Sequence, residues 1–172
     1  GATALASGLG CCSALQALSL EHNPLQDSGI TALADAVQGY TSLETLCCHH
    51  AGIGDAGGER VAGLLAVCSR LSSLNMAKNS LSDRSATAMA DALDHNSSLS
   101  SLNLESNRIS DPGASHFASV VSCREAGLAS GGLKLFLACN AVSEEAQERL
   151  AATLGSTCMY GLRFSMALEL ER

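Results

Sequence analysis

The stretch Leu71-Ser-Ser-Leu74-Asn-Met76-Ala-Lys-Asn79 decides the fold, because its spacing of apolar residues and asparagine returns along the chain. Its first leucine belongs to a series with a constant interval of 28 residues, namely Leu15, Leu43, Leu71 and Leu99. A shorter match, Leu135-Phe-Leu137-Ala-Cys-Asn140, follows after a longer interval, since five extra residues lie within 122–132. The sequence is therefore built on a repeat of 28 residues.

Further positions recur after the asparagine of each unit. The second residue after it is Leu, Ile or Val, the fourth is acidic, and those at ten, eleven and fourteen are apolar. The acidic column reads Asp27, Asp55, Asp83, Asp111 and Glu144, and the column at eleven reads Ala34, Ala62, Ala90, Ala118 and Ala151. Agreement at so many columns predicts five structurally equivalent units.

Each unit has the pattern of a strand, a turn, a helix and a return. Leu18 and Leu20 alternate with outward residues, as in a strand with one buried face. The asparagine side chain is expected to bond the turn backbone and link neighbouring coils. The acidic residue stands where a helix N-cap is expected, and the later apolar columns match one face of a helix.

Stacking such units predicts an α/β solenoid of about five repeats with partial units at its ends. Strands lie about 4.8 Å apart, whereas packed helices need about 8–10 Å. The parallel sheet should therefore form the concave face and the helices the convex face. A single unit cannot bury its own apolar faces, so stability must come from its neighbours.

This pattern resembles the ribonuclease-inhibitor type of leucine-rich repeat, which occurs in ribonuclease inhibitor, the Ran GTPase-activating protein, NOD-like receptors and tropomodulin. The resemblance runs from about Leu15 to Leu154 and implies the curved solenoid of that family. The second repeat departs from it, because Ala51 replaces the asparagine and Cys48 replaces a leucine. Its turn is expected to be less tightly bonded.

We expect one domain over residues 1–172. Residues 1–14 form a partial N-terminal unit that contains the last turns of a helix, and residues 15–158 hold the five repeats, with a loose loop at 122–132. Residues 159–172 form a terminal strand or a partial repeat. Leu162–Leu170 alternates in polarity, which favours a closing strand and leaves docking by strand addition to another chain as the alternative.

Composition excludes several classes of function. The net charge is −7, and the two lysines and eight arginines form no basic cluster, which argues against nucleic acid. No apolar run approaches the roughly 20 residues of a spanning helix, so membrane insertion is not expected. The eight cysteines include the adjacent pairs Cys11-Cys12 and Cys47-Cys48, an arrangement that does not favour mutual bridges. We expect reduced thiols in an intracellular reducing compartment, the cytoplasm first.

Strand alternation predicts which side chains point outward from the concave sheet. They are mostly small, uncharged and able to form hydrogen bonds. The candidate partner-binding residues are Ser19, Glu21, Cys47, His49, Asn75, Asn103, Glu105, Lys134 and Phe136. Ala17, Thr45, Ser73, Ala77, Ser101 and Ala138 lie in the same rows. Phe136 is either an exposed binding anchor or a side chain packed under the inserted segment.

The segment Cys47-Cys48-His49-His50 contains zinc-ligand types. On one strand, however, only Cys47 and His49 would face outward together, which leaves two ligands where a structural zinc site has four. His22 shares a column with His50, so a cluster is conceivable, but exposed histidines on a recognition surface are the favoured interpretation. No motif supplies an activated thiolate. Neither an enzyme nor a bound metal or cofactor is expected.

The favoured hypothesis is a protein–protein interaction scaffold or adaptor subunit. It would bind its partner through the concave sheet or the solenoid ends, within a larger assembly. The alternative is a regulatory repeat domain, either GTPase-activator-like or receptor-like, with a functional polar cluster around Arg108. The acidic column is read as helix capping, in preference to a row of calcium ligands.

Overall fold

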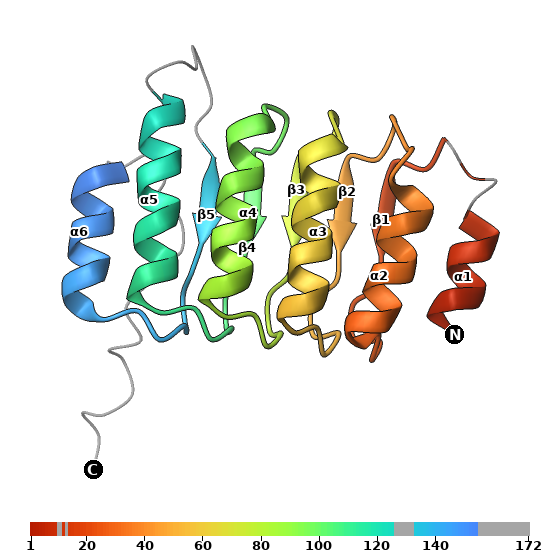
Figure 1. Ribbon diagram of the computed structural model, residues 1–172, viewed down its shortest axis with the longest axis horizontal. Coiled ribbons are helices and arrows are strands. Elements are labelled where there is room, and N and C mark those ends of the chain that lie inside the picture. The colour runs from red at the N-terminus through yellow and green to blue at the C-terminus, as the bar shows by residue number, and fades with distance from the viewer. Residues whose placement is uncertain (10–11, 13, 126–132, 155–172) are drawn as a thin grey trace, which may run out of the picture.

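The computed structural model describes residues 1–9, 12, 14–125 and 133–154, in which helices and strands alternate (Figure 1). The helices are α1 (Ala2–Leu9), α2 (Gln26–Val37), α3 (Asp55–Val67), α4 (Asp83–His95), α5 (Asp111–Glu125) and α6 (Glu144–Leu154). The strands are β1 (Ala17–Ser19), β2 (Thr45–Cys47), β3 (Ser73–Asn75), β4 (Ser101–Asn103) and β5 (Lys134–Phe136). The predicted order of strand, turn and helix is therefore confirmed in these residues.

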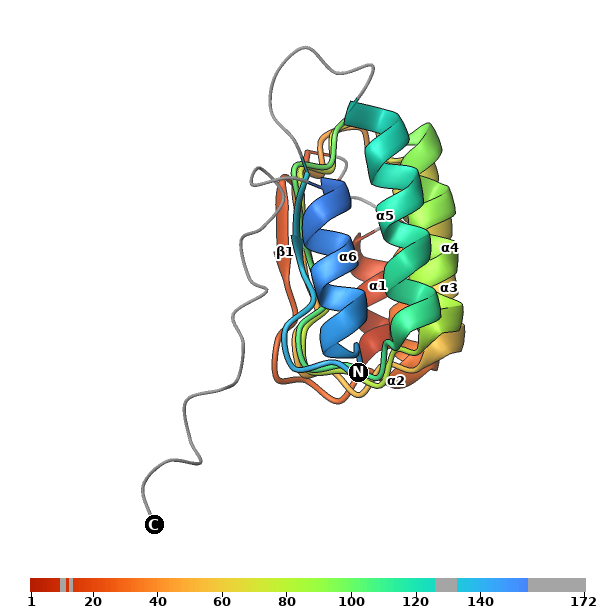
Figure 2. The same ribbon diagram turned by 90° about the vertical axis from the view of Figure 1, so that its left-hand side faces the viewer.

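The strands form one parallel sheet in the order β1-β2-β3-β4-β5, with each strand beside its sequence neighbour. The register brings equivalent residues together, so that Leu18, Leu46, Leu74, Leu102 and Leu135 lie in one row. The row is buried from Leu46 onward and half-buried at Leu18, where the sheet ends. Figure 2 shows the strands in one layer and the helices in the other. The molecule is the α/β solenoid that the repeat predicts.

The core lies between these two layers and is continuous from repeat to repeat. The helix columns at ten and fourteen positions after the asparagine fill it, as Leu33, Val61, Met89 and Phe117 illustrate with 2% exposure or less. The alanine column is buried as well from Ala34 to Ala118 and half-buried at Ala151, and its short side chains let each helix lie close to the sheet. Each helix packs against the one that follows, so a repeat completes its core with its neighbour.

The asparagine column links neighbouring turns, as the sequence predicts. The Asn79 side chain donates from Nδ2 to the carbonyls of Cys48 and Met76, 2.9 Å away in each case. Its Oδ1 accepts the backbone N–H groups of Ala51 and Ile53 at 3.1 and 3.0 Å. One side chain thus satisfies backbone groups of two repeats, and Asn107 and Asn140 repeat the arrangement.

The acidic column differs from the prediction in which helix it caps. Asp55 is the first residue of α3, not its N-cap, and its carboxylate bonds across to the start of α4. The Asp55 oxygens accept the N–H and hydroxyl of Ser82 at 2.9 and 2.5 Å, and the hydroxyl of Ser85 at 2.5 Å. Asp27, Asp83 and Asp111 make equivalent bonds to the following repeat. Each carboxylate therefore caps the next helix, where the positive end of the helix dipole favours it.

These bonds predict how stability depends on pH. Burial raises the pKa of Asp55, but the hydrogen bonds from Ser82 and Ser85 outweigh it, and the net pKa is lowered. A carboxyl whose pKa is lower in the folded state adds stability above its unfolded pKa of about 3.9. That stability is lost as the pH falls through the folded pKa. We expect the urea midpoint of Asp55→Asn to lie below that of the wild type at pH 7 and to approach it near pH 2.

The control for this prediction is Asp94→Asn, which removes one exposed carboxylate from α4. Its urea midpoint should follow the wild-type profile from pH 7 to pH 2. A constant gap between Asp55→Asn and the wild type over that whole range would contradict the assignment of Asp55 as an ionised cap.

The two ends of the chain test other expectations. Ala2–Leu9 is helical, as predicted for the N-terminal unit. The insertion was predicted to be a loop from residue 122, which is wrong for its first part, because α5 continues to Glu125. The helix can run past the usual stop because this repeat has additional residues before its next strand. Residues 126–132 and the segment Leu162–Leu170 lie outside the described residues.

Candidate functional site

The outward side of the five strands forms one surface, which we call the sheet face. It comprises Ser19, Glu21, Cys47, His49, Asn75, Asn103, Glu105, Lys134 and Phe136, with the small residues between them. All nine of these side chains are exposed or half-buried, as alternation predicts. Ala77, which was expected in an outward row, is buried at 4% exposure. Its methyl group is short, and the equivalent positions on both sides carry the longer His49 and Glu105.

Two asparagines at the centre of the sheet face are held in place by their own strands. The Asn75 Oδ1 accepts the backbone N–H of Ala77 at 3.1 Å, and the Asn103 Oδ1 accepts that of Glu105 at 2.9 Å. These bonds use the side-chain oxygens and fix the side chains near the strand ends. The amide groups therefore form an ordered polar centre, flanked by the Ser73 and Ser101 positions.

The charged and the bulky side chains of the sheet face lie toward its two ends. Glu21 lies beyond β1 and Glu105 beyond β4, while Lys134 begins β5. Phe136 is half-buried at the end of β5, beside Asn103 in the register. Phe136 therefore exposes part of its aromatic ring. The other possibility, that the ring packs under the inserted segment, involves residues 126–132, which lie outside the described residues.

Three histidines gather where β1 and β2 end, and the sequence prediction for this segment was wrong in one respect. It placed residues 47–50 on one strand, but β2 ends at Cys47 and a turn follows. His22 and His50 have positive φ angles of 59° and 53° in equivalent turns. Their Nδ1 atoms lie 3.1 Å apart. The His49 ring also packs edge-on against His22, with centroids 4.9 Å apart.

The electrostatics of this histidine group arise from its crowding. Desolvation lowers the pKa of His49, and the charges of His22 and Lys78 lower it further, while Glu21 acts in the opposite direction. A proton on the His49 ring is therefore disfavoured. Neutral imidazoles keep lone pairs that can accept a hydrogen bond or bind a metal ion.

The cysteines near this group have different environments. Cys48 is fully buried in the leucine column, and burial raises its pKa to about 12, with Cys47 adding to the effect. Its thiol therefore stays protonated and behaves as a small apolar side chain. The Cys47 thiol donates to a carboxylate oxygen of Glu21 at 3.8 Å. Neither thiol has the electropositive setting of a catalytic nucleophile.

Within the described ranges, no group of three or more histidine, cysteine, aspartate or glutamate side chains is arranged to hold a metal ion. The same part of the chain contains no helix long and apolar enough to cross a membrane. Cys68, expected to be a small buried group near a helix end, is buried next to α3, and burial raises its pKa.

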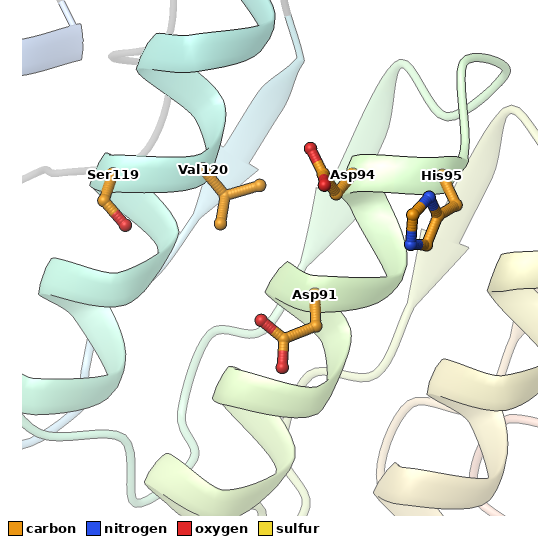
Figure 3. Close-up of a pocket in the computed structure, with 5 residues that line it drawn as sticks. All are labelled: Asp91, Asp94, His95, Ser119 and Val120. Atoms are coloured by element: carbon orange, nitrogen blue, oxygen red, sulfur yellow. The ribbon is translucent and has the colours of Figure 1, made fainter.

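A hollow also lies on the helix face, between α4 and α5 (Figure 3). Asp91, Asp94 and His95 of α4 line it, together with Ser119 and Val120 of α5. The Asp91 carboxylate bonds the His116 Nε2 at 2.7 Å and joins the two helices. This arrangement serves the packing of neighbouring repeats, and the sheet face is the broader candidate surface.

Comparison with known proteins bears on these repeats directly. A family model described as "Leucine Rich repeat" matches residues 11–34 and 95–118. The matched segments start three repeat lengths apart and cover equivalent parts of the first and fourth repeats. The chain therefore contains leucine-rich repeats. The spacing of its columns places these leucine-rich repeats in the ribonuclease-inhibitor-like type.

Solved structures share this fold. Leiomodin-1 Actin-Binding Site 2 is 12% identical with a TM-score of 0.65, and the match covers 89% of this chain and 85% of that one. The tropomodulin C-terminal domain of Caenorhabditis elegans is 13% identical with a TM-score of 0.64, covering 87% and 90%. A search of curated protein sequences found no match. At these identities the likeness shows the fold.

Proposed function

We propose that this chain is a protein–protein interaction module, and not an enzyme, whose sheet face binds a partner within a larger assembly. The observation that carries the proposal is the continuity of that face. Five strands in register present an uninterrupted surface of small polar side chains, with the long charged residues at its margins. A surface of this kind can exclude water against a partner without burying unpaired charge.

The distribution of side chains supports this proposal further. Asn75 and Asn103 are ordered by their own backbone, so little side-chain entropy is lost when their amide groups bind. Phe136 adds a partly exposed aromatic group at the last strand, where a binding hot spot would need an anchor. The intracellular, cytoplasmic placement expected from the cysteines belongs to the same proposal.

A substitution at the centre of the sheet tests the function. Ser73→Arg places a long cation among the small side chains of β3, and we expect partner capture to fall at least about tenfold through steric and desolvation costs. Cross-linking mass spectrometry on the captured complex should find links at Lys134 and at the acidic residues of the sheet face. Purified actin is the first partner to test, by co-sedimentation, because one structural neighbour is named for an actin-binding site.

The matched control is Ser115→Arg at an exposed position of α5, which makes the same change of residue and charge and should leave capture unchanged. Equal losses in both variants, with cross-links confined to the helices, would contradict the proposed surface. Circular dichroism of each variant separates lost binding from lost folding.

A further inference from the structure

The histidines at the ends of β1 and β2 are brought together by the repeat itself. His22 and His50 occupy equivalent turns, 28 residues apart, and both have the left-handed backbone. Lys78, Ser106 and Cys139 occupy the same position in later repeats with φ angles of 54–56°. The turn geometry therefore stacks this column along one edge of the sheet, and the first two repeats each place an imidazole in it.

The separation of the two ring nitrogens suits a chelate. Imidazole nitrogen lies about 2.0–2.1 Å from a bound zinc ion. Two such nitrogens 3.1 Å apart subtend an angle of about 100° at the metal, which is between the octahedral and tetrahedral values. In the metal-free protein the same pair can share one proton as a hydrogen bond. A small rotation about the side-chain bonds would aim both lone pairs at one ion.

The environment of the pair favours an ion with open coordination positions. His22 and His50 are exposed, so water can complete the coordination shell. His49 lies beside both rings, at centroid distances of 4.9 and 6.2 Å, and Lys78 contributes an unfavourable positive charge nearby. Imidazole ligands favour Zn²⁺, Cu²⁺ and Ni²⁺ over the hard cations Mg²⁺ and Ca²⁺.

The pair also lies where the asparagine column is interrupted. In other repeats an asparagine at this position links its turn to the preceding one, but the second repeat has Ala51 there. Backbone bonds still join the first two turns, such as the one from the Gln26 N–H to the Ala51 carbonyl at 3.0 Å. A metal ion on the two imidazoles would bridge the same two repeats. Its binding would therefore stabilise the N-terminal end of the sheet face.

We propose that His22 and His50 chelate one divalent transition-metal ion of the Zn²⁺, Ni²⁺ or Cu²⁺ class, and that the ion joins the first two repeats. The proposal is independent of the partner-binding function. It also departs from the sequence-based expectation that no metal is bound, which rested on the four ligands of a structural zinc site, although a cluster of His22 with His50 was conceivable.

Isothermal titration of the reduced, metal-free protein with NiCl₂, and then with ZnCl₂, tests the proposal. We expect one equivalent to bind to the wild type, and His22→Asn and His50→Asn each to bind at least about tenfold more weakly, because each loses the chelate. Asparagine tolerates the left-handed turn, so both variants should fold. His95→Asn, which changes an exposed histidine on α4, should bind like the wild type.

Two further readouts separate this site from binding by cysteines. Co²⁺ bound at the proposed site should lack the near-ultraviolet charge-transfer band of thiolate ligation, and Cys47→Ser should retain binding. Hydrogen exchange should slow in the turns at 21–26 and 49–53 when Ni²⁺ is added to the wild type, and not in His50→Asn. Absence of binding at millimolar Ni²⁺, or equal affinity in the two turn-histidine variants and the wild type, would overturn the proposal.

Discussion

Asn79→Ala should destabilise the protein by about 2–4 kcal/mol. The Asn79 amide donates to carbonyls of the second and third repeats and accepts the N–H groups of Ala51 and Ile53. Both of those residues are fully buried, so water cannot easily replace the lost acceptor. Denaturation in urea, followed by circular dichroism, measures the loss. Hydrogen exchange should locate it, with faster exchange at the Ala51 and Ile53 amides.

The first repeat contains the matched control for this experiment. The Asn23 side chain donates to the Leu20 and Glu21 carbonyls of its own turn, at 3.3 and 3.1 Å, and is exposed. Asn23→Ala removes the same chemical group without breaking a link between repeats, so its cost should be below about 1 kcal/mol. Equal costs for the two variants would show that the bonds between repeats contribute little to stability.

The architecture could be predicted from sequence because the repeat imposes the same constraints many times. The leucine row from Leu46 to Leu135, the alanine column and the asparagine links follow from burial and from unpaired backbone groups, which every repeat must satisfy. The apolar columns hold in all five units, whereas the asparagine column fails at Ala51. The outward rows followed from strand alternation in the same way, with Ala77 as the exception.

Features that depend on the join between two repeats were harder to predict. Asp55 was expected to cap its own helix, since a sequence pattern shows spacing along one unit and not the distance to the next. His50 was expected to point away from His49, because alternation was applied beyond the end of β2 into a turn with positive φ. The recurrence of non-glycine residues at this turn position gave no signal of its left-handed backbone.

Gly58→Ala should destabilise the protein by about 2 kcal/mol, although alanine favours a helix more than glycine does. A Cβ atom on Gly58 would meet the Ser85 hydroxyl and would lie 2.8 Å from the Ser85 Cβ and 2.9 Å from the Leu81 Cδ2. These atoms cannot readily move, because Ser85 is fully buried and its hydroxyl donates to Asp55. Helix α3 would have to move away from α4 and weaken the cap as well as the core.

Gly63 lies in the same helix and separates the packing effect from helix propensity. A Cβ there would approach only the end of the flexible Arg60 side chain, at 3.7 Å, among the atoms near that position. Gly63→Ala should therefore stabilise the protein by about 0.5–1 kcal/mol, the usual gain for an exposed helix interior. Urea midpoints of the two variants should shift in opposite directions. If the urea midpoints of both variants rise, the close approach of α3 and α4 at Gly58 does not limit stability. The two helices would then have room for a methyl group beside Ser85 without loss of its bond to Asp55.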